Sequence, residues 1–406
     1  MQAESFEFNP LSPEFQANPY DYYQAIRQFM PQLHYAEWNT WFLTRHNDCS
    51  AVLKDQRFGH EILKIATREE LGWGDVPEDQ RAVSAVFQSW MLNRDPPDHT
   101  RLRSLVHKAF TPRIVERLRD KAQSLTDAAI NQLLDEREAD LIELLAMPIP
   151  VTIIAELLGV PSNDQDAFRG WSRALAGSFE MTQEPEVYRQ ASRAADEFNA
   201  YFRELIAEKQ RHPREDLLSA LAAVDAEGDR LSEEETLAMC ILLLVAGHET
   251  TVNLIGNGTL ALLRNPDQFA LFAAHPAGLA KTAVEEFIRY DGPVQLTSRF
   301  ALEDGELNGM NFHKGQEIIT IIGAANRDPE KFENPESLDI TRTDNPHLGF
   351  GAGIHYCLGS PLARLEGQIV FATLAERVPN LQLAVSDPAR RKTYVLRGLA
   401  ELPVRV

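Results

Sequence analysis

The segment between Ser232 and Pro266 most constrains the fold, because it predicts one long helix that is apolar on nearly every face. Ser232 with Glu235 forms a capping-box start, and Pro266 marks the end. A helix that is apolar all round must be buried, and at about 1.5 Å per residue this one is long enough to cross a whole globular body. Its polar start and a polar interruption argue against a membrane span. We therefore expect a mainly helical body built around this segment.

The interruption is Ala246-Gly247-His248-Glu249-Thr250-Thr251, where an acid and two hydroxyls enter the apolar run. Burying a carboxylate is costly unless it is paired or used in chemistry. In a structural interpretation, Thr250 bonds to a carbonyl one turn earlier and Glu249 reaches solvent or a buried arginine. In a functional interpretation, Glu249 and Thr250 form a catalytic acid–alcohol pair.

A glycine-rich loop, Phe350 to Gly359, places Cys357 directly before a predicted helix over 361–378. Glycines let such a loop approach a flat partner closely. The unpaired N–H groups and the positive end of the helix should lower the pKa of the thiol and prepare a thiolate for a metal. A lone cysteine is otherwise a small buried apolar residue. Neither Cys49 nor Cys240 has a comparable setting.

The pattern Phe350-Gly-x-Gly-x-His355-x-Cys357-x-Gly359 resembles the haem-ligand loop of the cytochrome P-450 superfamily, and the resemblance spans nearly the whole chain. The sequence looks like a soluble bacterial member, with Ala352 where the family often has a second histidine. The resemblance implies a mainly α fold with a small β-rich region. It also implies haem b (heme b, iron protoporphyrin IX) as cofactor, bordered by Phe350 and Gly359, with the Cys357 sulfur as the axial ligand of the iron.

The interruption of the long helix is similar to the family's Ala/Gly-Gly-x-Glu/Asp-Thr motif. The resemblance implies that Ala246 and Gly247 lie at the haem, and that Gly247 lacks a side chain where the helix must clear its face. It further implies that Thr250 places water at the iron and that Glu249 relays protons through water. In the family this pair accompanies the use of O2 and two electrons.

His99 and Arg103 are four residues apart, so they share one face of a predicted helix. Taken alone, such a pair is an ordinary solvated surface. Their flanking residues match the family's haem-facing helix. The resemblance implies that His99 and Arg103, together with Arg299 and His355, bind the haem propionates through charge-assisted hydrogen bonds.

Glu286 and Arg289 are three residues apart, a spacing that alone says little. By their order along the chain, Glu286, Arg289 and Arg342 resemble the buried Glu-Arg-Arg cluster that supports the loop behind the haem. The implied role is structural and not catalytic.

Substrate choice is expected to depend on apolar segments over the distal face of the haem. Each residue is more often part of the core than of a pocket, but together they imply an apolar or amphipathic substrate. The resemblance to bacterial enzymes of the family implies a substrate of fatty-acyl, macrolide or polyketide, or terpenoid type. By position in the family, the candidates are Val86, Phe87, Trp90, Met91, Leu175, Phe179, Leu243, Val294, Leu296 and Val395.

Composition limits the partners and the compartment. A net charge of −20 argues against nucleic acid or an anionic membrane as a partner. The first residues show no signal-peptide pattern, and three widely spaced cysteines fit a reducing compartment, so we expect a cytoplasmic protein.

A basic stretch departs from the overall acidity, and a solvated helix face is its simplest interpretation. The resemblance places it near the cysteine ligand, where acidic electron-transfer proteins dock, which predicts a ferredoxin or flavodoxin donor. The stretch comprises Arg101, Arg103, Lys108, Arg113, Arg117, Arg119 and Lys121.

With 44% hydrophobic residues and no linker or repeat, the chain favours a single cytochrome P-450 domain over 1–406. A β-rich side region is expected over about 30–45, 292–325 and 394–406. Besides the long helix, helices are expected over 20–29, 47–56, 100–135, 150–158, 164–177, 186–211, 215–224, 267–274, 277–290 and 361–378.

These features predict a haem-thiolate monooxygenase that inserts one atom of O2 into an apolar small molecule, with electrons from a ferredoxin and ferredoxin reductase. A non-catalytic haem-binding sensor or ligand carrier of the same fold is the alternative, and the Glu249 and Thr250 pair argues against it. A cysteine hydrolase using Cys357 and His355 fails on geometry, because residues two apart do not face each other at a helix start.

Overall fold

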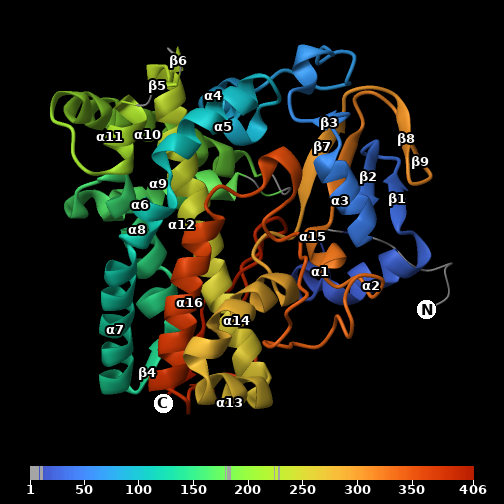
Figure 1. The fold of residues 1–406 in the computed structure, drawn as a ribbon. Helices are drawn as coiled ribbons and strands as arrows, with labels where there is room; N and C mark the ends of the chain where they lie inside the picture. The colour runs from blue at the N-terminus through green and yellow to red at the C-terminus, as the bar shows by residue number, and fades with distance from the viewer. Residues whose placement is uncertain (1–8, 10–11, 179, 181–183, 224, 227–228) are drawn as a thin grey trace.

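The computed structural model describes residues 9, 12–178, 180, 184–223, 225–226 and 229–406 (Figure 1). The predicted long helix is α12 (Glu233–Arg264), and it runs through the helical body. The Ser232 hydroxyl accepts the N–H of Glu235, and the Glu235 carboxylate accepts the N–H of Ser232, which completes the capping box. α12 is long and apolar enough to cross a membrane, but 83% of its most apolar window is buried against the rest of the protein. α12 is therefore a core helix of the protein.

The helical body consists of helices that surround α12 (Figure 1). They are α4 (Arg81–Ser89), α5 (Asp98–Ala109), α6 (Pro112–Glu116), α7 (Arg119–Glu136), α8 (Pro148–Leu158), α9 (Gln165–Gly177), α10 (Pro185–Arg211), α11 (Leu217–Ala223), α13 (Pro266–Ala274), α14 (Pro276–Tyr290) and α16 (Ser360–Arg377). A π-helical turn at Ile142–Ala146 precedes α8. α12 contacts α8, α9, α14 and α16, which is consistent with its burial in the core.

The β-rich side region lies at the right of Figure 1. Its five-stranded sheet has the order β1-β2-β10-β7-β3, in which β10 is parallel to β2 and the other pairs are antiparallel. These strands are β1 (Gln32–Tyr35), β2 (Thr40–Leu43), β3 (Phe58–Gly59), β7 (Thr297–Ala301) and β10 (Glu317–Thr320). The short helices around the sheet are α1 (Pro13–Ala17), α2 (Tyr20–Phe29), α3 (His46–Lys54) and α15 (Ile322–Ala325).

Three smaller sheets complete the described part of the fold. The hairpin of β8 (Gly305–Leu307) and β9 (Met310–Phe312) turns at Asn308 and Gly309, both with positive φ, as a two-residue turn requires. A short pair is formed by β5 (Asp225–Ala226) and β6 (Asp229–Arg230), and a three-stranded sheet by β4 (Glu138–Asp140), β11 (Gln382–Leu383) and β12 (Pro403–Arg405).

Two sequence-based expectations about the elements are wrong. The single helix expected over 100–135 is three helices, because Thr111 caps a new helix through Ile114 N–H and Pro112 cannot continue the previous one. The 394–406 tail does not join the β-rich side region as a whole. Leu396 bridges to Val294 there, but β12 pairs with β4 and β11 at the far side of the molecule.

Candidate functional site

Cys357 lies in the loop that leads into α16. Its N–H donates to the Phe350 carbonyl at 2.9 Å, which closes the loop on itself. Gly351 and Gly353 have φ of +70° and +68°, a region that favours glycine. A Cβ at Gly353 would also lie 2.3 Å from the Leu53 carbonyl oxygen. The loop therefore needs glycine at these two positions to lie against α3.

The Cys357 sulfur is half-buried, and the backbone N–H groups of Gly359 and Ser360 donate to it at the start of α16. Burial nevertheless raises the pKa of the thiol, because it outweighs these donors and the charges of Arg103 and Arg364. The expectation of a lowered thiol pKa is therefore wrong for the chain by itself. A coordinating metal deprotonates a thiol outright, so it would supply the missing stabilisation of the thiolate.

Cys49 and Cys240 are both fully buried. Burial raises the pKa of each thiol far above its usual range, and the Cys49 sulfur donates to the Leu43 carbonyl at 3.3 Å. Both cysteines fit the core role that a lone cysteine ordinarily has.

Five basic side chains, which we call the basic cluster, gather beside the cysteine loop: His60, His99, Arg103, Arg299 and His355. The ring of His355 lies 4.2 Å from that of His99 and 4.9 Å from that of His60, between ring centroids. Burial, followed by the charges of Arg299, His99 and Arg103, lowers the pKa of His355 to about 3. The structure thus brings together the four predicted propionate ligands and adds His60, which belongs to no sequence motif.

The basic cluster holds unused donors, and the charge of Asp95 acts on Arg299 and His99 without an ion pair. Nε2 of His60, both ring nitrogens of His99 and Nε2 of His355 are buried without a hydrogen-bond partner in the part of the chain that the structure describes. Arg299 is 5% exposed, and burial lowers its pKa to about 10. Among the described residues, no carboxylate forms an ion pair with any member of the basic cluster. Buried cations and donors without an anion are costly, so the two carboxylates of a haem fit this place.

α12 provides a second feature that fits a flat apolar group. Ala246 is exposed although it lies in the middle of a core helix, while Val245 before it is buried. Gly247 is explained differently, because the Cβ that it lacks would lie 3.0 Å from Ile154 of α8. That Gly247 also clears the face of the haem stays a prediction. The structure explains this glycine by the close packing of two helices.

The acid and the alcohol of α12 both have partners within the protein. The Thr250 hydroxyl donates to the Ala246 carbonyl at 3.0 Å. The Glu249 carboxylate accepts Nη1 of Arg391 at 2.6 Å and lies 3.5 Å from Nε2 of His248. Although burial alone would raise it, His248 and Arg391 lower the pKa of Glu249 to about 2. These are the contacts that the structural interpretation anticipates, and the sequence did not reveal Arg391 as the partner.

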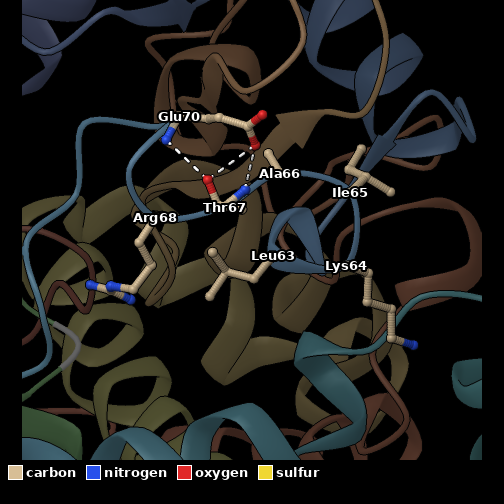
Figure 2. Close-up of a pocket in the computed structure, with 7 residues that line it drawn as sticks. All are labelled: Leu63, Lys64, Ile65, Ala66, Thr67, Arg68 and Glu70. Atoms are coloured by element: carbon tan, nitrogen blue, oxygen red, sulfur yellow. Dashed lines mark hydrogen bonds between the residues drawn. The ribbon is translucent and has the colours of Figure 1, made fainter.

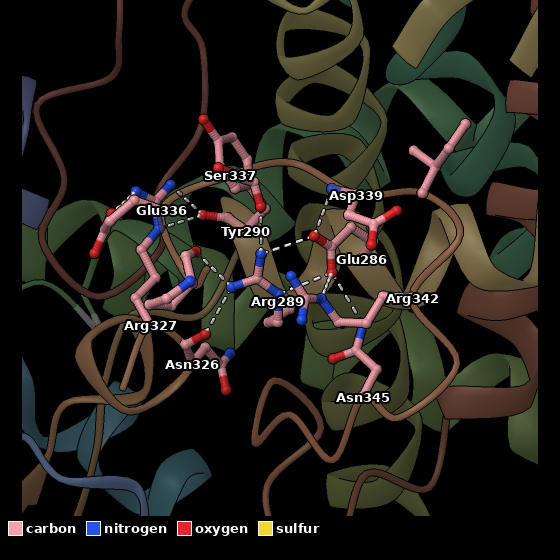
Figure 3. A network of polar contacts seen from close by, with 12 residues as sticks. Glu286, Arg289, Tyr290, Asn326, Arg327, Glu336, Ser337, Asp339, Arg342 and Asn345 are labelled. Atoms are coloured by element: carbon pink, nitrogen blue, oxygen red, sulfur yellow. Dashed lines mark hydrogen bonds and ion pairs between the residues drawn. The ribbon is translucent and has the colours of Figure 1, made fainter. Parts of the chain in front are cut away.

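Figure 3 shows Glu286, Arg289 and Arg342 in one polar network. The Glu286 carboxylate accepts two hydrogen bonds from Arg289, at 2.8 and 2.7 Å, and one from Arg342 at 3.1 Å. The side chains of Glu286 and Arg289 are both 0% exposed. The three predicted residues therefore form a buried charged cluster.

The same network holds the chain that leads to Cys357. Arg289 donates to the carbonyl oxygens of Asn326, Pro335 and Ser337 at 3.0, 2.7 and 3.0 Å. The Asn326 side chain in turn accepts the N–H of Leu348 at 2.7 Å. Glu286 and Arg289 thus fasten the segment from 326 to 348, which runs directly into the glycine-rich loop.

The predicted pocket residues divide between two apolar clusters. Several belong to the main core cluster or pack against it: Val86, Phe87, Trp90, Met91, Leu175 and Leu243. Leu296 and Val395 belong to a smaller cluster in the β-rich side region, and Val294 bridges to Leu396 beside it. Phe179 lies outside the described residues. Core packing accounts for the main-cluster residues in this structure.

Glu180, which sequence reasoning missed, connects the end of α9 to the segment that carries Val395. Its carboxylate accepts the N–H groups of Val395 at 2.9 Å and Leu396 at 3.2 Å, and also that of Tyr394. Burial raises the pKa of Glu180. Two segments predicted to border the substrate are therefore tied together by one carboxylate.

Figure 2 shows an open surface pocket of about 390 Å³ in the loop that follows β3. None of the predicted haem or substrate residues lines this pocket. Its walls are Leu63, Lys64, Ile65, Ala66, Thr67, Arg68 and Glu70.

A family model described as "Cytochrome P450" matches residues 75–270 and 278–378. The chain belongs to the cytochrome P450 family. It is 42% identical to the polyketide biosynthesis cytochrome P450 PksS of Bacillus subtilis, over 99% of both chains. It is 41% identical to the cytochrome P450 monooxygenase PikC of Streptomyces venezuelae, over 98% of this chain and 94% of that one.

A solved cytochrome P450 structure shares the fold. P450BioI, crystallised in complex with a hexadec-9Z-enoic acid ligated acyl carrier protein, superimposes with a TM-score of 0.89. The two are 38% identical, over 97% of this chain and 98% of that chain. The predicted family and the mainly helical cytochrome P450 fold are confirmed.

In this cytochrome P450 the basic stretch is partly neutralised by its own neighbours, and it is spread over three helices. Arg101 pairs with Glu235 and Asp229. The other internal pairs are Arg117–Glu215, Arg119–Glu116 and Lys121–Glu156. Within the described chain, Lys108 and Arg113 form no ion pair.

Proposed function

We propose that this cytochrome P450 is a haem-thiolate monooxygenase that hydroxylates an apolar small molecule. The observation that carries the proposal is the basic cluster, which gathers the buried Arg299, the half-buried Arg103 and histidine ring nitrogens that lack partners among the described residues, all beside a half-buried cysteine. An anionic, flat, metal-containing group satisfies both features together. Haem b would be held by Cys357 at the iron, by His99, Arg103, Arg299 and His355 at the propionates, and by Ala246 on its distal face.

When bound, haem with a thiolate ligand supplies the activation of O2, because the sulfur pushes electron density toward O–O cleavage. The protein's own part is to hold the group, exclude water and deliver protons. Thr250 offers a hydroxyl on the same turn as the exposed Ala246, and Glu249 lies next to it. A carboxylate with a pKa of about 2 carries no proton near neutral pH. Glu249 would therefore have to leave Arg391 and contact water before it could relay one.

An apolar acyl or polyketide chain is the substrate class that we favour. The names of two relatives refer to polyketide biosynthesis and to a sixteen-carbon acyl chain on a carrier protein. The side chains predicted to border the substrate, among them Trp90, Met91, Leu243 and Leu296, are apolar. We expect a surface of this kind to bind fatty-acyl, macrolide or terpenoid skeletons more tightly than charged metabolites.

The electron donor that we propose is a ferredoxin or flavodoxin. Lys108, at the end of α5, and Arg113, in α6, form no ion pair within the described chain, whereas Arg101, Arg117, Arg119 and Lys121 of the basic stretch each pair with a carboxylate. Association with an acidic donor should therefore slow as ionic strength rises. A rate that does not respond to salt would contradict this docking surface.

The test is turnover by the purified, haem-loaded protein with a ferredoxin, a ferredoxin reductase and NADPH under ¹⁸O2. Hexadecenoic acid, a macrolactone and a terpenoid serve as probes, and a hydrophilic sugar serves as the negative control. We expect a spectral shift from displacement of iron-bound water by at least one apolar probe, followed by a product with a single ¹⁸O atom. Haem binding and probe binding without ¹⁸O incorporation from any donor would favour the sensor or carrier alternative.

A further inference from the structure

His60 belongs to the basic cluster, although no sequence motif marks it. It follows β3, and its ring stands edge-on to that of His355, at 84° and 4.9 Å between centroids. It thereby approaches the basic cluster from the β-rich side region, whereas His99 and Arg103 come from α5 and His355 comes from the cysteine loop.

The backbone around His60 is fixed by a reciprocal pair of carboxylates. The N–H of His60 donates to the two oxygens of Asp95 at 3.0 and 2.9 Å, and the N–H of Glu61 donates at 2.8 Å. In return, the Glu61 carboxylate accepts the N–H of Asp95 at 2.8 Å. A Cβ at Gly59 would lie 2.5 Å from an Asp95 oxygen, so glycine is needed for this approach. The loop is therefore locked to the residues that begin α5.

The His60 side chain is held in place but unsatisfied. Its Nε2 is buried and has no hydrogen-bond partner among the described residues. Burial, and then the charges of Arg299, His355 and His99, lower the pKa of His60 well below its usual value. A neutral imidazole with its hydrogen on Nε2 is a donor, and a buried donor without an acceptor is costly. We expect a negatively charged acceptor at His60 Nε2, because the Arg299 guanidinium lies beside the His60 ring.

We propose that His60 is a fifth ligand of the haem carboxylates, donating a hydrogen bond from Nε2 to a propionate alongside His99, Arg103, Arg299 and His355. This inference rests on the proposed haem site. It adds a second contact from the β-rich side region, beside that of Arg299 on β7.

The experiment measures the rate of haem transfer from the holoprotein to excess apomyoglobin, together with the reduction potential of the iron. His60→Leu and His60→Phe remove the donor, and the phenylalanine keeps a ring against His355. His60→Gln keeps a side-chain N–H, and His107→Leu changes an exposed histidine on α5 as a matched control. Because a charge-assisted hydrogen bond is lost, we expect haem transfer to accelerate by roughly tenfold in the Leu and Phe variants. Their potentials should become more negative, while the Gln variant and the control stay within about twofold of the parent rate.

Unchanged transfer rates and potentials in both the Leu and the Phe variants would overturn the inference. Equal acceleration in the Leu, Phe and Gln variants would overturn it as well, because a retained side-chain N–H would then make no difference to haem transfer. A parent protein that binds no haem would instead contradict the proposed function, so the two failures are distinguishable.

Discussion

Replacing Arg289 by alanine is the sharpest test of how the protein supports its cysteine loop. Arg289→Ala removes five hydrogen bonds, two to Glu286 and one each to the carbonyls of Asn326, Pro335 and Ser337. It leaves the Glu286 carboxylate, which is fully buried, with a reduced set of donors. Removal of one partner from a buried ion pair costs about 3–5 kcal/mol, because the remaining charge is uncompensated.

We expect the lower end of that range, because Arg342 and Asn345 still donate to Glu286 at 3.1 and 3.2 Å. For 406 residues, a loss of about 3 kcal/mol corresponds to a fall in Tm of roughly 4 °C. The larger effect should be on the cofactor, because the carbonyls that Arg289 holds belong to the segment leading to Cys357. The variant is therefore expected to lose haem on purification.

The assay is haem content per protein, with Tm from calorimetry. Arg264→Ala is the matched control, because Arg264 also pairs with a carboxylate, Asp387, but at the surface, where the partners are 43% and 87% exposed. An exposed pair contributes less than about 1 kcal/mol, so the control should keep its haem and its Tm. Normal haem content and an unchanged Tm in Arg289→Ala would refute the reasoning.

Three further predictions concern α12 and α16. Thr250→Ala should still bind substrate but release more hydrogen peroxide per electron consumed, and full coupling of electrons to product would contradict the role of this hydroxyl. Arg391→Ala removes a group that lowers the pKa of Glu249. A lowered carboxylate pKa stabilises the folded state; this contribution is fully present above the pKa of about 4.5 in the unfolded chain and is lost as pH falls through the folded pKa of about 2. The variant should therefore be less stable than the parent by about 1–2 kcal/mol in urea unfolding at pH 7, with the difference vanishing near pH 2; an equal difference at both pH values would exclude this linkage. Glu366 is 1% exposed, and burial raises its pKa to about 8, so the folded protein holds a proton that the unfolded chain releases above about pH 4.5. Stability should then fall as pH rises from about 4.5 to 8 and level off above that, and Glu366→Gln should flatten that fall in Tm; parallel curves would show that the carboxyl is not the cause.

The sequence predicted correctly those elements whose capping, apolar pattern or turn is determined by residues close together in the chain. The capping box at Ser232, the uniform apolarity of α12 and the turn at Asn308 and Gly309 are each specified by residues within a few positions of one another. The break at Pro112 was equally local, and the prediction of one helix over 100–135 overlooked it.

The remaining features depend on contacts between distant segments, which periodicity does not report. Arg391 reaches Glu249 across 142 residues, and Glu180 meets Val395 across 215. The pairing of β12 with β4 joins residues near 404 to residues near 139. A strand pattern identifies a strand but not its partner.

The sign of the thiol pKa at Cys357 illustrates the same limit. Counting the donors at a helix start predicts a lowered pKa, and those donors are present at Gly359 and Ser360. Burial by the rest of the fold outweighs them, and no local pattern reports how deeply a side chain will be buried. The chemistry of the sulfur therefore depends on what binds it.

The most direct test of the account is the absorbance of the reduced, carbon-monoxide-treated protein. A sulfur–iron bond from Cys357 predicts the red-shifted Soret band of a thiolate-ligated haem in the parent and its loss in Cys357→Ser. Cys49→Ser, which changes a buried cysteine, should keep the band. A parent protein without the band, or a Cys357→Ser variant that retains it, would contradict the central claim.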